Sequence, residues 1–252
     1  MHLVIGDVHG HVASLRTVLH ASGVFYRSDT KVILLGDYVD KGPYSWLVVS
    51  EIQKMMSDAP GRVFAVLGNH DEYYVRYARH LRKREQDPSY VVPMTPNEES
   101  LDVYRTLGSG RVDFLAGLPR RYAFDVDGAR WNAVHAGLEP GDPHSDEKVL
   151  RVRYVDPASG KSKGLGPGFS VPEGTQYWAE LYDGDVNVVY GHHVHSRERP
   201  VETRGQRGQR LLSVDTGCGY GGILSAVSIE TGEVWQANAD GDYVGKTEVA
   251  RF

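Results

Sequence analysis

The chain has 252 residues, 40% of them hydrophobic, and a formal charge of −5 at pH 7. This length suits one α/β domain, residues 1–252, with a single large core, and the composition argues against a membrane protein or a broadly basic nucleic-acid binder. We therefore expect no membrane association and no stable nucleic-acid partner, and any affinity for anions must be local.

The chain contains one cysteine, Cys218, so no internal disulfide can form. A reducing, cytoplasmic setting fits this composition best. The N-terminal residues lead directly into the first predicted strand, and we expect no signal peptide. Cys218 itself is expected to be a small core residue rather than a nucleophile.

The first third of the chain repeats one design, in which a short apolar run ends in glycine and a polar cluster. The clusters are GDVHG at 6–10, GDYVDKG at 36–42 and GNHD at 68–71. Apolar residues at helical spacing follow the first cluster up to Gly23, and a second helix is predicted from about Trp46 to Met55. Alternating strands and helices predict parallel strands in a layered sheet.

Asp37 is expected just past the carboxyl end of a buried strand at residues 31–35, where α/β sheets usually place their ligands. A carboxylate has two oxygens and can bridge two cations about 3.5 to 4 Å apart. A single acidic turn after a strand is usually a loop or a helix cap. Three such clusters in one third of the chain instead predict a metal site.

The middle of the chain is predicted to contain helices and surface loops. A helix from Tyr73 to Gln86 is followed by a surface excursion at 87–100 and by helical stretches at 101–107 and 112–118. The first of these helices carries a basic cluster of Arg76, Arg79, Arg82, Lys83 and Arg84. Such a cluster is usually a solvated face.

The second half is predicted to be mostly β. Residues 122–126 and 130–134 flank Asp127-Gly128, which favours a type I′ hairpin whose second strand leads to His135. A loop at about 139–176 contains a Gly- and Lys-rich stretch at 161–168, and we expect differences in substrate specificity to arise in this loop. It is either a mobile lid or simply disordered. Short strands follow at 186–190, 211–214, 223–229 and 234–237, whereas the tail from Ala239 has no clear pattern.

The three leading clusters resemble the first motifs of the calcineurin-like metallophosphoesterases, in the phosphoprotein phosphatase (PPP) superfamily. The likeness continues in AVHAG at 133–137 and VVYGH at 188–192. It is strongest to bacterial and phage members, including PrpE-like phosphatases, the phosphatase module of polynucleotide kinase-phosphatases and symmetrical diadenosine tetraphosphatases. The resemblance implies a four-layer α/β sandwich of two mixed β-sheets flanked by helices, with a variable helical cap at about 73–118.

The resemblance also implies a dinuclear metal site. One ion would be held by Asp7, His9 and Asp37, and the second by Asp37, Asn69, His135 and His192. Mixed oxygen and nitrogen ligands suit Mn²⁺, which we expect, with Fe or Zn²⁺ as alternatives. Two dications lower the pKa of a shared water to roughly 7, so the implied mechanism is attack of a metal-bridging hydroxide on phosphorus.

The same resemblance makes His70 the general acid and Asp40 the carboxylate that orients it. The alternative is that His70 is a further metal ligand. Lys41, Asn69 and Arg153 are expected to bind the substrate phosphate, although Arg153 could equally be a solvated surface arginine. Lys41 stands where the family carries an arginine, so it would bind phosphate as a point charge without a bidentate grip.

The position two residues after His192 is Val194, whereas phosphodiesterases of the wider superfamily carry a second ligand histidine there. This difference favours the PPP-like branch. His193 and His195 are more often surface histidines than ligands in such a setting.

We therefore expect a metal-dependent phosphomonoesterase that resembles serine/threonine protein phosphatases and acts on a phosphoprotein or a small phosphoester. The first alternative is a symmetrical diadenosine tetraphosphatase, which splits a phosphoanhydride with the same site. In that case the basic helix could pair with the extra phosphates of a dinucleotide polyphosphate. A non-catalytic binding scaffold is the remote alternative, because such scaffolds typically lack several ligands and every expected ligand is present here.

Overall fold

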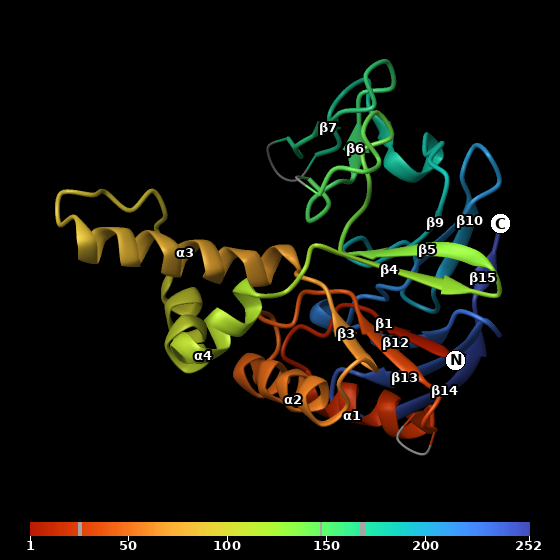
Figure 1. The fold of residues 1–252 in the computed structure, drawn as a ribbon, viewed down its shortest axis with the longest axis horizontal. Helices are drawn as coiled ribbons and strands as arrows, with labels where there is room; N and C mark the ends of the chain where they lie inside the picture. The colour runs from red at the N-terminus through yellow and green to blue at the C-terminus, as the bar shows by residue number, and fades with distance from the viewer. Residues whose placement is uncertain (25–26, 147, 167–169) are drawn as a thin grey trace.

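The computed structural model describes residues 1–24, 27–146, 148–166 and 170–252. Two six-stranded mixed sheets face each other, and the N- and C-terminal ends of the chain lie on the same side of the molecule (Figure 1). This architecture confirms the predicted α/β fold with two mixed sheets. In the described residues no helix is both long enough and apolar enough to cross a bilayer.

The first sheet has a parallel half and an antiparallel half. Its parallel strands are β1 (His2–Ile5), β2 (Lys31–Leu34) and β3 (Val63–Ala65), as the strand–helix alternation predicts. The antiparallel strands that continue it beside β1 are β12 (Ile223–Ser228), β13 (Glu233–Asn238) and β14 (Tyr243–Glu248). The helices α1 (Val12–Ala21) and α2 (Ser45–Asp58) cover the outer face of this sheet (Figure 1).

The second sheet is built mainly from the second half of the chain. In spatial order its strands are β15 (Ala250–Arg251), β10 (Val201–Arg204), β11 (Arg210–Ser213), β9 (Asn187–Tyr190), β5 (Ala129–Val134) and β4 (Arg121–Val126). Asp127 and Gly128 both have positive φ, 50° and 78°, and join β4 to β5. This confirms the predicted hairpin, because a type I′ turn needs positive φ at both positions.

Fully buried aliphatic side chains fill the space between the two sheets. Val4 and Ile33 from the first sheet pack with Val189 and Leu212 from the second. A larger cluster joins the first sheet to α1 and α2, and it includes Leu15, Val18 and Ile52. Burial at these positions removes apolar surface from water, and it holds the strand ends rigidly in place.

The segment at 139–176 contains a small three-stranded sheet of β6 (Tyr154–Val155), β7 (Ser162–Lys163) and β8 (Gln176–Tyr177). The short 3₁₀ helix η3 (Trp178–Glu180) follows it, and its Trp178 ring packs against Tyr190 of β9. Residues 147 and 167–169 of the predicted variable loop, which include the end of the Gly- and Lys-rich stretch, lie outside the described residues.

Three strands of the two large sheets, β10, β14 and β15, have no counterpart in the sequence prediction, and neither do the short strands β6, β7 and β8 of the predicted loop. In β10 the buried residue is Glu202, which pairs with Arg210 of β11 at 2.7 Å, so a charged residue stands where an apolar one would signal a strand. Strand β14 lies at the sheet edge and contains no buried residue. Its sequence therefore lacks the alternation that predicts a half-buried strand.

Two long helices, α3 (Asn69–Gln86) and α4 (Glu98–Ala116), pack against each other beside the sheets. The prediction that α3 begins at Tyr73 is wrong: the GNHD cluster is its first turn, with Gly68 as the N-cap. Helix α4 is interrupted at Gly108, where φ is 65° and ψ is 167°. This break agrees with the two separate helical stretches predicted there.

The break in α4 gives a matched pair of glycine substitutions. Neither Gly108 nor Gly110 has an atom within 4 Å of an added Cβ, so only backbone conformation distinguishes them. Gly108→Ala should lower the free energy of unfolding by about 1–3 kcal/mol, because its φ and ψ are essentially restricted to glycine. Gly110→Ala should raise it by about 0.5–1 kcal/mol, because alanine is favoured inside a helix. Urea denaturation of both variants checks this. Equal changes in the free energy of unfolding would contradict the non-helical backbone at Gly108.

Candidate active site

The carboxyl ends of the parallel strands meet at one edge of the fold, where a cavity of about 800 Å³ opens. Five of the six predicted metal ligands line it: Asp7, His9, Asp37, Asn69 and His192. His135, the sixth, is fully buried below, with its Nε2 2.9 Å from Asn69 Oδ1. The structure therefore brings all six residues together from five separate parts of the chain.

Asp37 lies at the centre of this group. Its Oδ2 is 3.6 Å from His9 Nε2, and its Oδ1 is 3.3 Å from His135 Nε2. Two sets of potential ligands share Asp37, one with His9 and His70 and the other with His135 and His192. Within each set the ligand atoms lie within 4.8 Å of one another. Such an arrangement suits a carboxylate that bridges two ions.

Hydrogen bonds to main-chain carbonyls fix the orientation of two of the histidines. His9 Nδ1 lies 2.8 Å from the carbonyl oxygen of Val39, and His135 Nδ1 lies 2.8 Å from that of Leu35. If Nδ1 donates its proton in each case, Nε2 is left unprotonated and faces Asp37. This is the tautomer that metal-ligating histidines need.

The carboxylates of the site are crowded and buried. Burial and the charges of Asp215 and Asp37 raise the pKa of Asp7 well above its ordinary value. Burial also raises the pKa of Asp215 to about 6. Within the described ranges, the ion-pair partners of Asp37 are histidines only. A concentration of carboxylate oxygens, imidazole nitrogens and one amide oxygen, in which no Lys or Arg of the described residues pairs with Asp37, fits divalent metal ions well.

Asp71 is a site residue that the sequence analysis did not identify. It is fully buried, and its Oδ2 accepts hydrogen bonds from the backbone N–H groups of Asp37 and Gly68 at 2.8 and 2.9 Å. Its Oδ1 accepts a third from the N–H of Tyr38 at 2.9 Å. Burial and the charge of Asp37 raise the pKa of Asp71 to about 7. Asp71 thus ties the second polar cluster to the third.

Asp215 also lines the cavity and was not predicted as a site residue. It follows the apolar end of β11, and its Oδ1 accepts a hydrogen bond from the N–H of Gly217 at 2.9 Å. A polar residue directly after an apolar strand is the same signal that identified Asp7 and Asp37. The strand-end pattern could therefore have found it.

His70 and Asp40 form the pair that the sequence predicts. His70 Nδ1 lies 2.6 Å from Asp40 Oδ2, and the hydroxyl of Tyr74 donates to the other oxygen of Asp40. Burial lowers the pKa of His70, but the hydrogen bond to Asp40 and the charge of Asp37 outweigh it and raise the pKa. His70 Nε2 is 4.0 Å from Asp37 Oδ2, so this nitrogen faces the candidate metal site.

Cationic side chains stand on the cavity wall. Arg153 donates to the carbonyl oxygen of His192 at 2.9 Å, and its Nε is buried without a hydrogen-bond partner in the described part of the chain. It is therefore anchored in the wall rather than free on the surface. Arg151 is paired with Glu72 at 2.7 Å, and Lys41 Nζ lies 5.2 Å from the centre of the exposed Tyr220 ring.

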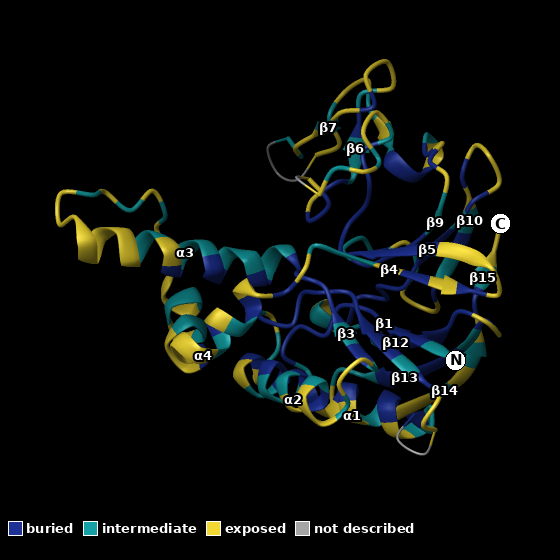
Figure 2. Ribbon diagram, viewed as in Figure 1, coloured by how far each residue is buried: buried dark blue, intermediate teal, exposed yellow. Residues whose placement is uncertain are grey.

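His193 and His195 pack against each other and against Tyr177, with ring centres 4.6 to 5.2 Å apart. Neither residue lines the cavity. The basic residues at the far end of α3 do not line it either. That end of the helix is exposed (Figure 2), and Arg82 is paired with Asp113 of α4.

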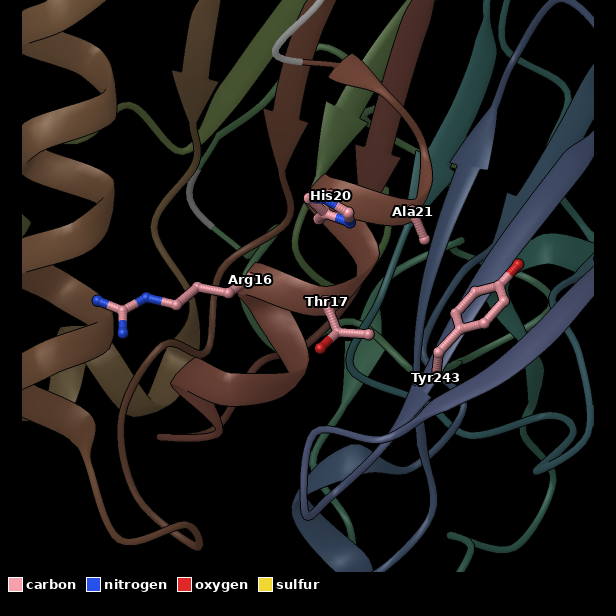
Figure 3. Close-up of a pocket in the computed structure, with 5 residues that line it drawn as sticks. All are labelled: Arg16, Thr17, His20, Ala21 and Tyr243. Carbon is pink, nitrogen blue, oxygen red and sulfur yellow. The ribbon is translucent and has the colours of Figure 1, made fainter.

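A second pocket of about 540 Å³ lies between α1 and β14. Its Arg16 side chain points away from Tyr243 (Figure 3) and is paired with Glu51 of α2 at 2.7 Å. The remaining lining residues are Thr17, His20 and Ala21, and they assemble no cluster of potential metal ligands within the described residues. The chemistry therefore concentrates at the strand ends.

The chain is similar to known phosphoesterases. The family model for calcineurin-like phosphoesterases matches residues 2–215, and the chain belongs to that family. It is 27% identical to the bis(5′-nucleosyl)-tetraphosphatase PrpE [asymmetrical] of Halalkalibacterium halodurans, over 89% of this chain and 88% of the relative. It is 37% identical to the serine/threonine-protein phosphatase PP2A-like PPG1 of Candida albicans, but over 61% of this chain and only 32% of that protein.

Among solved structures, one that is provisionally assigned as a diadenosine tetraphosphatase superimposes with a TM-score of 0.62. The sequence identity is 24%, and the match covers 94% of this chain and 92% of the other. At this identity the likeness concerns the fold alone.

The contacts of Asp71 generate a stability prediction. Asp71→Ala should lower the free energy of unfolding by about 3 kcal/mol or more, because it leaves three buried N–H groups without an acceptor, at about 1–3 kcal/mol each. It should also weaken metal binding, because the backbone of Asp37 is released. Asp102→Ala is the matched control, since this exposed carboxylate pairs with Arg105 on the surface, where an ion pair contributes about 1 kcal/mol or less. Equal losses in the two variants by urea denaturation would contradict the role of Asp71.

Proposed function

We propose that this phosphoesterase hydrolyses a phosphoanhydride bond in dinucleoside polyphosphates. The observation that carries this proposal is the wall of the cavity: three cationic residues, Lys41, Arg151 and Arg153, surround the candidate metal site together with the exposed aromatic ring of Tyr220. An aromatic ring beside phosphate-binding groups offers a stacking surface for a base. The relative named as a bis(5′-nucleosyl)-tetraphosphatase supports the same substrate class.

The proposed metal ligands are Asp7, His9, Asp37, Asn69, His135 and His192. Asp37 would be shared by two ions, and we expect both ions to be Mn²⁺. When bound, such ions supply Lewis acidity and an activated water. The residues of the chain do the rest. Arg153, Lys41 and Asn69 line the cavity and would hold the non-bridging oxygens of the phosphoryl group.

His70 would serve as proton donor. Water adds to phosphorus and gives up one proton to solvent, the bond from phosphorus to the bridging oxygen breaks, and that oxygen takes a proton from His70 Nε2. Asp40 holds the ring through Nδ1, and the Tyr74 hydroxyl fixes Asp40 in turn. Because the pKa of His70 is raised, its protonated form is more abundant at neutral pH than that of a free histidine.

Hydrolysis of phosphomonoesters, as in the protein phosphatases, is the second candidate. It is the substrate class that the sequence analysis expects, and the comparisons do not confirm it. One observation favours it: the His70–Asp40 pair is well formed, and a general acid contributes most when the leaving group is poor, as in alkyl phosphates. The two candidates use one site and differ in what it binds beyond the reacting phosphoryl group.

A substrate comparison tests the proposal. With Mn²⁺ present, diadenosine tetraphosphate should be cleaved with a kcat/KM about 100-fold above those of p-nitrophenyl phosphate and a phosphopeptide, which corresponds to about 2.7 kcal/mol of additional transition-state binding. Product analysis by ion-exchange chromatography shows which anhydride bond breaks. A higher kcat/KM on the monoesters would reject the proposal in favour of the second candidate.

Substitution of His70 separates its two possible roles. His70→Asn should lower the rate on an alkyl phosphate by about 10² to 10⁴-fold and the rate on p-nitrophenyl phosphate far less, because nitrophenolate leaves without needing a proton. The metal content should match that of the wild type. Loss of metal in the variant, measured by plasma mass spectrometry, would instead make His70 a metal ligand.

A further inference from the structure

A further pocket of about 390 Å³, distinct from the one between α1 and β14, adjoins the central cavity on the side of α3 and α4; it is called the cap-side pocket below. The two hollows share Asn69, His70 and Arg151, so they form one continuous surface around these residues. A pocket of this volume lies within the range of about 300 to 1,000 Å³ that small-molecule ligands occupy.

The outer wall of this pocket comes from the cap. Tyr73 of α3 contributes an aromatic side chain, Thr95 and Asn97 come from the segment between α3 and α4, and Ser100 belongs to the first turn of α4. The Tyr73 ring meets the Tyr74 ring edge-on, with ring centres 5.2 Å apart. This contact orients the Tyr73 ring beside the pocket.

The chemistry of this wall differs from that of the central cavity. Its cap residues are neutral, with one aromatic ring, three hydroxyls and one amide. Arg151 and His70 lie on its border with the central cavity, and the carboxylate of Asp40, which faces only the cap-side pocket, is paired with His70. A ligand that fits has an uncharged aromatic part with several hydrogen-bonding groups, attached to an anionic part that reaches the metal site. A nucleoside with its phosphates has this form.

The position of His70 indicates which part of the substrate enters the cap-side pocket. Asp40 lines the cap-side pocket but not the central cavity, and it binds His70 Nδ1 at 2.6 Å. The proposed proton donor therefore stands on the border between the metal site and this pocket. Because the leaving oxygen must approach the proton donor within hydrogen-bond reach, the leaving group is directed to the cap side.

We propose that the cap-side pocket holds the nucleoside of the leaving nucleotide, with Tyr73 stacking on the base and Thr95, Asn97 and Ser100 contacting the ribose or base edge. This inference rests on the proposed function, since it assigns one nucleoside of a dinucleoside polyphosphate to the cap-side pocket. It makes the segment 87–100 a determinant of substrate choice. Tyr220, on the central cavity, remains available for the other half of the substrate.

The test compares ADP with pyrophosphate, which lacks the nucleoside, by isothermal titration calorimetry on the Mn²⁺-loaded full chain. Two variants change the pocket: Tyr73→Ala removes the ring, and Thr95→Trp fills the space from an exposed position. Each should weaken ADP binding about 10-fold or more relative to pyrophosphate, since stacking on one aromatic ring is worth that much. Tyr73→Phe should restore the wild-type ratio.

The matched control is Val91→Trp, which adds the same bulk to the same segment at a side chain that is 82% exposed and does not line the pocket. It should keep the wild-type ratio of ADP to pyrophosphate affinity. The inference is overturned if Tyr73→Ala and Thr95→Trp both keep that ratio, and equally if Tyr220→Ala alone changes it.

Turnover separates this inference from the proposed function. Suppose that wild type cleaves diadenosine tetraphosphate, and that the pocket variants keep both the ratio of ADP to pyrophosphate affinity and the kcat/KM on the dinucleotide relative to that on p-nitrophenyl phosphate. The proposed function then stands, and the pocket assignment is wrong. If wild type fails to cleave the dinucleotide while the pocket variants lose ADP selectively, the nucleoside pocket stands and the proposed function falls.

Discussion

The buried carboxylate of Asp71 is the constraint on which the candidate site depends. It accepts the backbone N–H groups of Asp37, Tyr38 and Gly68, and so it joins the loop after β2 to the first turn of α3. Asp37 makes a hydrogen bond in the opposite direction, since its Oδ1 accepts the N–H of His70, in the first turn of α3, at 2.9 Å. The distances among the proposed metal ligands and the proton donor are therefore set by hydrogen bonds within the chain. A site arranged in this way needs little reorganisation when it binds ions or substrate.

This arrangement carries a conformational cost. Five residues of the site other than glycine have positive φ, between 46° and 67°: His9, Asp37, Asp40, Lys41 and His192. Each costs about 1 kcal/mol or more, so their sum is a large part of the net stability of an ordinary domain. The two buried sheets supply the support, and close packing at glycines preserves it. A Cβ at Gly68 would lie 2.0 Å from Asp37 N, and one at Gly191 would lie 2.1 Å from Asp7 Oδ1.

Sequence patterns predicted the parts of the molecule in which local and global signals agree. The parallel strands, α1 and α2 follow from apolar runs that end in polar clusters, and the 127–128 hairpin follows from the Asp-Gly dipeptide. The set of six proposed ligands came from the resemblance to the metallophosphoesterases. The start of α3 was misplaced because its first turn is made of site residues rather than of an apolar stripe. Strand β10 was missed because the Glu202–Arg210 pair is a tertiary contact, and Asp71 because its partners are backbone N–H groups, which no side-chain pattern reveals. The cap-side pocket likewise depends on how α3 and α4 pack.

Whether Asp37 joins two metal ions is decided by anomalous diffraction from crystals loaded with Mn²⁺. We expect two anomalous peaks on either side of the Asp37 carboxylate. One peak should be in contact with Asp7 and His9, and the other with Asn69, His135 and His192. A single peak, or two peaks of which Asp37 touches at most one, would contradict it.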